Sequence, residues 1–361
     1  MISRIVAPSL LALSLAAAPA LAEEPGNIAL ILPLKGRMAN AASAVRDGFL
    51  AAYYQDLEQH KPSPIVRIYD NGDGQALKLV HNAVADGAQA IVGPLNKEQV
   101  TELATAGVPP VPVLALNRSE ISAPNIYQFA LAPEDEMAAL AGFMRQQGLE
   151  HVRILSQEDP ASQRNRQAFE AAWKAAGGAP ATALVLESGA KGGVAKAIKQ
   201  FVAGGETQGV DAILLASPQL ATQVKPSFNY YGARQLPLYT LSTAFDASQN
   251  DTQRLDLNGV RFCDAPWIVK GGWPGQDDLY EANGRPASSF DRLYAFGGDA
   301  YSLINAVYEN HSELTLDGRS GRLNVNADGR VRRELSCVEV KDGHTEVLAA
   351  PGGVAAPASG T

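Results

Sequence analysis

The chain has 361 residues, a length that is enough for two ordinary globular domains. Its net charge is −8 at pH 7, and 46% of its residues are hydrophobic. The acidic excess argues against nucleic acid and anionic membrane surfaces as partners, because these need a basic footprint. The five histidines are scattered, and the sequence contains no HExxH, G-x-S-x-G or Walker A motif. We therefore expect neither an enzyme nor a metal or cofactor site.

Residues 1–22 have the order of a secretory signal peptide. One cation, Arg4, precedes an apolar run at 10–18 and the small-residue end Ala-Leu-Ala at 20–22. Pro8 and Pro19 bound the run, which is shorter than the roughly 20 residues that a membrane span needs. We predict cleavage near Ala22. No cysteine near that point could carry a lipid, so we expect a soluble periplasmic protein with no transmembrane segment.

From residue 27 onward, apolar strands alternate with amphipathic helices. Ile28 to Leu32 is apolar throughout, as in a parallel strand that is covered on both faces. This alternation predicts a first α/β lobe at 27–132, which part of 258–346 completes. The other strands predicted in this lobe are 65–74, 90–95, 111–117 and a short one near 125–129, and the helices that follow them lie near 75–87 and 97–106.

A second run of β-α units predicts a second α/β lobe at 133–257. It begins with a helix at Pro133-Glu134-Asp135-Glu136, because proline and acidic side chains are favoured in the first turn of a helix. Each lobe is predicted to be a doubly wound parallel sheet, with a cleft between the lobes. Strands are predicted at 151–159, 181–187, 211–217 and 236–242, with helices at 162–177, 193–204 and 218–231.

After residue 257 the regular alternation stops. The segment 258–346 is predicted to supply crossover strands, a long helix at 289–310 and hairpins. Asp-Gly pairs at Asp317, Asp328 and Asp342 have the chemistry that hairpin turns require. The end of the chain, 347–361, consists of small and polar residues, and we predict that it is a disordered tail.

Loops that follow the predicted strands carry hydroxyl, amide and charged side chains. In a two-lobed α/β protein such loops face each other across the cleft and can hold a small polar ligand. Each residue taken alone is better explained as a cap or a turn, and an obvious clamp for an amino acid is missing. The candidate cleft residues are Leu34, Lys35, Gly36, Arg37, Gly93, Pro94, Leu95, Asn117, Arg118, Gln128, Ser156, Ser242, Thr243 and Asp264.

The chain has two cysteines, Cys263 and Cys337, and both lie in runs that read as strands. In an oxidising compartment they could form a disulfide or remain a pair of free buried thiols. The sequence leaves both alternatives open, because spatial proximity cannot be read from it.

Several stretches resemble the penicillin-binding protein activators of the LppC/LpoA type. The most specific are YQFALAPEDE at 127–136 and FCDAPW at 262–267, whereas VGPL is shared more widely by type 1 periplasmic binding proteins. The resemblance runs from about Asn27 to Val347. The other matching stretches, in family order, are ALILPLKGRMANAASAVRDGFLAAYY, IVGPLNKEQV, VPVLALN, LPLYTLS and RLYAFGGDAYSLI.

This resemblance implies a two-lobed type 1 periplasmic-binding-protein fold and a non-catalytic role. The role is to bind a class A penicillin-binding protein and to stimulate peptidoglycan synthesis for the cell wall. Long members of the family are lipoproteins with an N-terminal helical-repeat domain, which this sequence lacks between the signal and its first strand. The alternative is a periplasmic solute-binding protein of an amino-acid or amide ABC transporter. The missing lipid cysteine favours this alternative, whereas the two specific stretches favour the activator.

Overall fold

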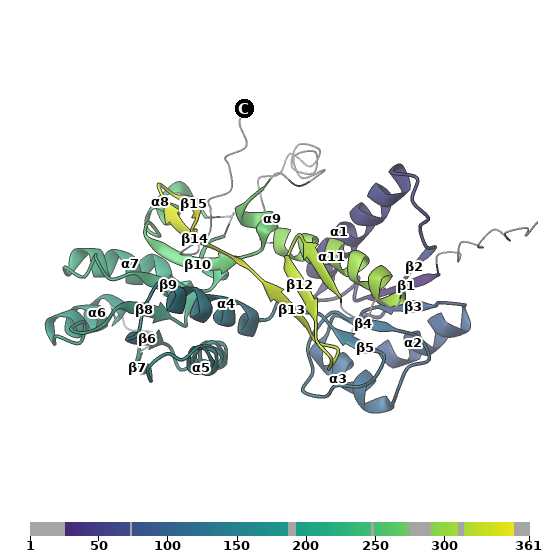
Figure 1. The fold of residues 1–361 in the computed structure, drawn as a ribbon, viewed down its shortest axis with the longest axis horizontal. Coiled ribbons are helices and arrows are strands. Elements are labelled where there is room, and N and C mark those ends of the chain that lie inside the picture. The colour runs from purple at the N-terminus through teal and green to yellow at the C-terminus, as the bar shows by residue number, and fades with distance from the viewer. Residues whose placement is uncertain are drawn as a thin grey trace, which may run out of the picture.

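The computed structural model describes residues 26–72, 74–186, 193–246, 249–271, 273, 290–309 and 314–349. The predicted signal peptide at 1–22 and residues 350–361 of the predicted tail lie outside the described residues. The chain forms two α/β lobes that lie side by side (Figure 1). Among the helices of the described residues, none combines the length and the apolar character that crossing a bilayer requires.

The first lobe is built on a five-stranded parallel sheet with the order β2-β1-β3-β4-β5. The chain passes from β1 to β2 on one side and then returns to β3 on the other, so the winding reverses between β1 and β3. In doubly wound sheets this reversal point is the usual ligand position. The strands are β1 (Ile28–Leu32), β2 (Val66–Asp70), β3 (Ala90–Val92), β4 (Val113–Ala115) and β5 (Ile126–Gln128).

Helices cover both faces of this sheet, which is why β1 is apolar at every position. Ile28, Leu30 and Leu32 belong to the core under helices α1 (Ala39–Glu58) and α11 (Asp291–Tyr308). The alternate residues Ala29 and Ile31 belong to the core under helices α2 (Ala76–Ala85) and α3 (Lys97–Ala106).

Helices α1 and α11 cross at very short range, and glycines make this possible. A Cβ atom on Gly48 would overlap the carbonyl oxygen of Tyr294, and one on Gly297 would overlap that of Val45. The close crossing brings α11, which is remote in sequence, into the core of the first lobe.

The second lobe repeats the winding of the first and then departs from it. Five parallel strands have the order β7-β6-β8-β9-β10, and β14 and β15 extend the sheet as antiparallel strands. The second sheet is therefore mixed rather than purely parallel. Its strands are β6 (Val152–Ser156), β7 (Thr182–Val185), β8 (Ala212–Leu215), β9 (Leu238–Thr240), β10 (Val260–Asp264), β14 (Ser336–Lys341) and β15 (His344–Val347).

Helices also cover both faces of the second sheet. Helices α4 (Pro133–Gln146) and α5 (Pro160–Ala175) pack on one face, and α6 (Gly193–Ala203) and α7 (Ala221–Tyr230) pack on the other. The remaining short elements are η1 (Pro218–Leu220), η2 (Ser242–Ala244), α8 (Asp251–Leu255) and α9 (Pro266–Val269).

A small antiparallel sheet of three strands completes the first lobe. It consists of β11 (Thr315–Gly318), β12 (Gly321–Val325) and β13 (Val331–Glu334). Leu323 and Val331 pack in the same core as β1 and α11. The segment predicted at 258–346 is thus divided, since β10, β14 and β15 join the second lobe whereas α11 and the small sheet join the first.

The chain crosses between the lobes after β5, after β10 and after β13. The last crossing is the most direct, because Leu335 alone separates β13 from β14. In Figure 1 these two strands run as one ribbon from one lobe to the other.

Two predicted boundaries near the C-terminus are wrong. Asp317 was predicted to form a turn with Gly318, but both residues lie in β11. The turn falls on Arg319 and Ser320 instead, because the Asp299 carboxylate accepts hydrogen bonds from their amides. The tail was predicted to begin at 347, but this residue ends β15. By contrast Asp342 and Gly343 form a two-residue turn with φ of 49° and 76°, as a type I′ hairpin requires.

Candidate functional site

At the reversal point of the first sheet, the predicted loop residues are held by contacts within the lobe. The Leu34 amide donates to Asp70 Oδ1 at 3.0 Å, and Lys35 Nζ lies 3.3 Å from Asp70 Oδ2. The Gly72 amide and Lys35 together hold the pKa of Asp70 below its ordinary value. Gly93 has a φ of 111°, and a Cβ there would overlap the Ile31 carbonyl oxygen, so only glycine fits. The loop that follows β1 therefore presents the exposed side chains of Lys35 and Arg37.

Most of the predicted cleft residues are either exposed or buried, whereas Leu34, Asn117 and Arg118 are half-buried. Lys35, Gly36, Arg37 and Thr243 are exposed, whereas Gly93, Pro94, Leu95, Gln128, Ser156, Ser242 and Asp264 are buried. Several polar side chains of the set already have hydrogen-bond partners within their own lobe, so they are not free for a solute. Gln128 bonds to the Ser119 amide and the Ile121 carbonyl, Asn117 bonds to the Leu95 carbonyl, and Ser156 bonds to the Gln157 carbonyl.

The start of helix α4 is where predicted residues from different loops come together. Arg118 follows β4 in the first lobe and donates to both carboxylate oxygens of Asp135, at 3.0 and 2.9 Å. It also donates to the Val331 carbonyl at 2.6 Å, and Arg333 Nε lies 3.4 Å from Asp135 Oδ2. The Asp135 side chain is only 8% exposed. Two arginines of the first lobe thus hold a buried carboxylate of the second.

A second ion pair crosses the junction of the lobes at the end of β10. Arg292, in the first turn of α11, donates from Nε and Nη2 to the Asp264 carboxylate at 2.6 to 3.0 Å. Its Nη2 also donates to the carbonyl oxygens of Ser242 and Phe245, at 3.1 and 3.2 Å. The predicted residues Ser242 and Asp264 therefore lie together, with an arginine between them.

Glu136 lies between these two ion pairs. Its Oε2 accepts a hydrogen bond from the Ser242 amide at 2.9 Å. Burial raises the pKa of Glu136, and the neighbouring Asp264 carboxylate raises it further, against the opposite effect of the Ser242 amide and of Arg333 and Arg292.

These side chains form one group, which we call the junction cluster. It contains three cations and three carboxylates, so the formal charges balance. Because Asp135 and Asp264 are each paired with arginines of the first lobe, the cluster ties the lobes together. Its members are Arg118, Asp135, Glu136, Asp264, Arg292 and Arg333.

Sequence reasoning missed part of this cluster. Asp135 and Glu136 were predicted to start a helix, which they do, but no partner was predicted for them. Arg292 and Arg333 were not among the candidate residues. The signal that could have identified Arg292 is that it begins RLYAFGGDAYSLI, one of the stretches that carry the family resemblance.

The two cysteines lie opposite each other in the antiparallel pairing of β10 and β14, and a disulfide joins them. Their sequence separation is 74, and the loop that they close contains α11 and the small sheet. Cys263 directly precedes Asp264, so the disulfide adjoins the junction cluster.

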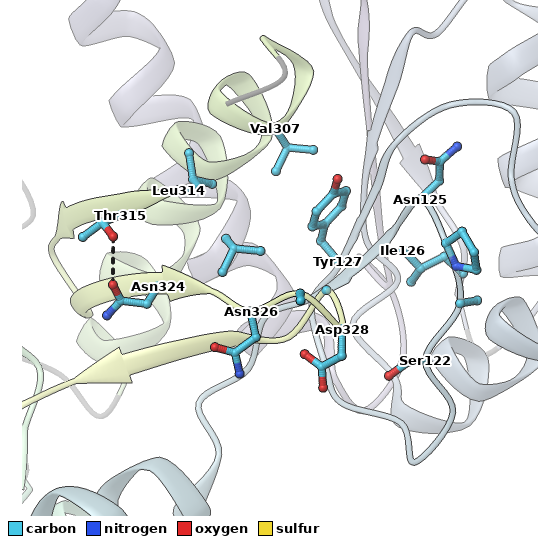
Figure 2. A pocket seen from close by; sticks show the side chains of 15 residues that line it. Ser122, Asn125, Ile126, Tyr127, Val307, Leu314, Thr315, Asn324, Asn326 and Asp328 are labelled. Carbon is cyan, nitrogen blue, oxygen red and sulfur yellow. Dashed lines mark hydrogen bonds between the residues drawn. The ribbon is translucent and has the colours of Figure 1, made fainter. Parts of the chain in front are cut away.

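The pockets among the described residues include one in the first lobe and one beside α4. One, with a volume of about 950 Å³, lies in the first lobe between the loop before β5 and the small sheet (Figure 2). The other, of about 780 Å³, lies between α4 and the crossing from β13 to β14. Neither is lined by any of the predicted cleft residues. The described residues also contain no group of three or more His, Cys, Asp or Glu that could hold a metal ion.

Comparison with known proteins gives consistent results for family and fold. The family model described as "LppC putative lipoprotein" matches residues 20–343. The penicillin-binding protein activator LpoA of Dickeya chrysanthemi is 29% identical over 319 residues, which cover 77% of this chain and 46% of that protein. This chain therefore spans about half the length of the curated relatives that it matches.

Solved structures of two kinds share the fold. The LpoA C-domain from Haemophilus influenzae, described as a regulator of PBP1A, aligns with a TM-score of 0.76 and 24% identity. The match covers 90% of this chain and all of that domain. A "putative branched-chain amino acid ABC transporter" from Chromobacterium violaceum aligns with a TM-score of 0.68 and 28% identity, over 87% of this chain and 99% of that one. The fold is thus shared by both functional classes.

Proposed function

This chain belongs to the LppC family, and from that premise we propose that it binds and activates a class A penicillin-binding protein in the periplasm. Its role is to regulate peptidoglycan synthesis by contact with the synthase and without catalysis of its own. The match of the family model over residues 20–343 is the observation that carries this proposal. Curated relatives named as penicillin-binding protein activators support it.

The junction cluster supports an activator rather than a solute-binding protein. Solute-binding clamps work by closing two lobes around a ligand, which requires a hinge that moves. Here Asp135 and Asp264 are buried in ion pairs that cross between the lobes. Both residues belong to the stretches that resemble the activators most specifically, 127–136 and 262–267. We infer that these stretches hold the lobes in one orientation, which suits a scaffold that presents a surface to a protein.

The test is a reconstitution with purified components. The mature chain is added to a detergent-solubilised class A penicillin-binding protein that is polymerising its lipid-linked glycan substrate. We expect a concentration-dependent, saturable rise in the polymerisation rate, together with direct binding in a pull-down. The matched control is a solute-binding protein of the same fold outside the LppC family, which should do neither. A full set of class A synthases that shows neither binding nor a change in rate overturns the proposal.

The transporter alternative is tested by thermal unfolding in the presence of amino acids and amides. A ligand that binds only the folded chain stabilises it by mass action, by about 2.7 kcal/mol at a hundredfold excess over its dissociation constant. We expect no such shift with any member of the panel. One amino acid or amide that raises the melting temperature in proportion to the logarithm of its concentration would transfer the assignment to the solute-binding class.

A further inference from the structure

The larger of the two pockets shares no lining residue with the junction cluster, and its lining differs chemically from that of the cluster. Its inner wall is apolar, because Ile126, Val307 and Leu314 are buried there beside the half-buried ring of Tyr127. Figure 2 shows the Tyr127 ring between Val307 and the turn that carries Asn326 and Asp328. An apolar wall with one aromatic ring suits a ligand that has a flat face of C–H groups.

Amide and hydroxyl groups surround this wall. Asn125 donates through Nδ2 to the Pro109 carbonyl, which leaves its Oδ1 able to accept. Among the described residues, neither the side-chain amide of Asn326 nor the Tyr127 hydroxyl makes a hydrogen bond, so both can serve a ligand. The other polar side chains that line the pocket are Ser122, Thr315, Asn324 and Asp328.

The charge of the lining restricts the ligand further. Among the described residues, no lysine or arginine lines the pocket, so this part of its lining offers no cation to a phosphate or to the carboxylate of an amino acid or a peptide end. The one acidic residue of the described lining, Asp328, accepts a hydrogen bond from the Arg330 amide at 3.1 Å, and its Oδ2 lies 3.8 Å from Arg330 Nη1. A purely apolar ligand is also disfavoured, because it would bury the amides without partners. A neutral ligand that is rich in hydroxyl and amide groups remains.

We propose that this pocket binds a neutral carbohydrate with N-acetylated amino sugar units, such as a segment of a glycan strand. The acetamido group is itself an amide and can exchange two hydrogen bonds with an asparagine side chain. Its methyl group then lies against the apolar wall, and a sugar face stacks on the Tyr127 ring. The volume of about 950 Å³ is within the range of small-molecule sites.

The test is a titration of the purified chain with the tetramer of N-acetylglucosamine, followed by calorimetry and by saturation-transfer NMR. We expect saturable binding, with the acetamido methyl groups receiving the strongest saturation transfer. Asn326→Ala should weaken the affinity about tenfold, the effect of losing one or two hydrogen bonds to a neutral ligand. Tyr127→Leu should weaken it as well, because the flat ring is lost. Asn82→Ala, an exposed change on α2, is the matched control and should leave the affinity unchanged.

Asn326 lies on a surface turn and uses only its backbone for structural hydrogen bonds, so its variant keeps the fold. Any of the following results would overturn the proposal: no saturation with the tetramer, equal affinity for a maltose-type tetramer without acetamido groups, or equal affinity of the Asn326→Ala and Asn82→Ala variants. Preferential binding of a short peptide would do the same. Because no synthase takes part in the titration, its failure would leave the proposed activation untouched.

Discussion

Replacement of Arg292 by methionine tests whether the junction cluster holds the two lobes together. The change keeps the length of the side chain but removes the cation from Asp264, whose own side chain is only 4% exposed. Leaving a buried carboxylate without its partner costs about 3–5 kcal/mol. The Ala265 amide still donates to Asp264 Oδ1 at 2.7 Å, so we expect the lower end of this range, about 3 kcal/mol.

The assay is urea unfolding at pH 7, followed by circular dichroism and by tryptophan fluorescence. With a slope of about 3 kcal/mol per molar urea, the midpoint should fall by about 1 M. Adding Asp264→Asn to the Arg292→Met variant should restore part of the stability, because a neutral amide costs less to bury than an unpaired carboxylate. Arg164→Met is the matched control. Its partner, Glu134, is 42% exposed and Arg164 itself 53%, so its loss should cost less than about 1 kcal/mol.

An unchanged midpoint in the Arg292→Met variant would refute this reasoning. So would a double variant less stable than Arg292→Met alone, since the cost would then come from something other than the unpaired Asp264 carboxylate. Equal losses in the Arg292→Met and Arg164→Met variants would show that burial at the junction has no special effect.

Three further outcomes are expected. Burial raises the pKa of Glu136, so the folded chain holds this proton to higher pH than the unfolded chain and loses stability as pH rises through the folded pKa. The melting temperature of the Glu136→Gln variant should therefore rise relative to that of the wild type from pH 4 to 7. A difference that stays constant over this range would contradict the prediction. Replacing Cys263 and Cys337 by serine should lower the free energy of unfolding by roughly 4 kcal/mol, because the disulfide no longer restricts the loop in the unfolded chain. Urea unfolding without reductant measures this difference. A loss under 1 kcal/mol would exclude a contribution of this size. Gly48→Ala should destabilise the chain by about 1–3 kcal/mol, because the new Cβ meets a backbone carbonyl. Gly142→Ala, in a helix with open space around it, should stabilise the chain by about 0.5–1 kcal/mol. Melting temperatures that shift in the same direction in both variants would contradict the packing argument.

Much of the fold could be predicted from sequence because its signals are local. An apolar run such as Ile28–Leu32 indicates a strand covered on both faces, and a Pro-Glu-Asp-Glu start indicates a helix. The Asp-Gly rule worked at Asp342 and failed at Asp317. It failed because the buried Asp299 carboxylate accepts hydrogen bonds from the amides of Arg319 and Ser320 and so places the turn at these two residues. Asp299 lies 20 and 21 residues away from them, so the Asp317-Gly318 pair gives no sign of this interaction.

The candidate site was predicted in part. Arg118, Ser242 and Asp264 were assigned to loops that meet between the lobes, and they do lie there. They were expected to face a small ligand, but they form ion pairs and hydrogen bonds within the chain. These contacts span long stretches, as between Arg118 and the Val331 carbonyl, which are 213 residues apart. No local sequence pattern predicts a hydrogen-bond or ion-pair partner that is so remote in sequence.

The sequence by itself determined the class of fold, the repeated winding of the two lobes and the resemblance to the LppC family. These follow from the order and periodicity of apolar segments and from short contiguous stretches, which are properties of the chain before it folds. Only the tertiary structure decided that Cys263 meets Cys337 and that Arg292 meets Asp264. The physical reason is that sheet register and the three crossings between the lobes set these contacts, and both depend on how the two cores pack as wholes rather than on any single segment.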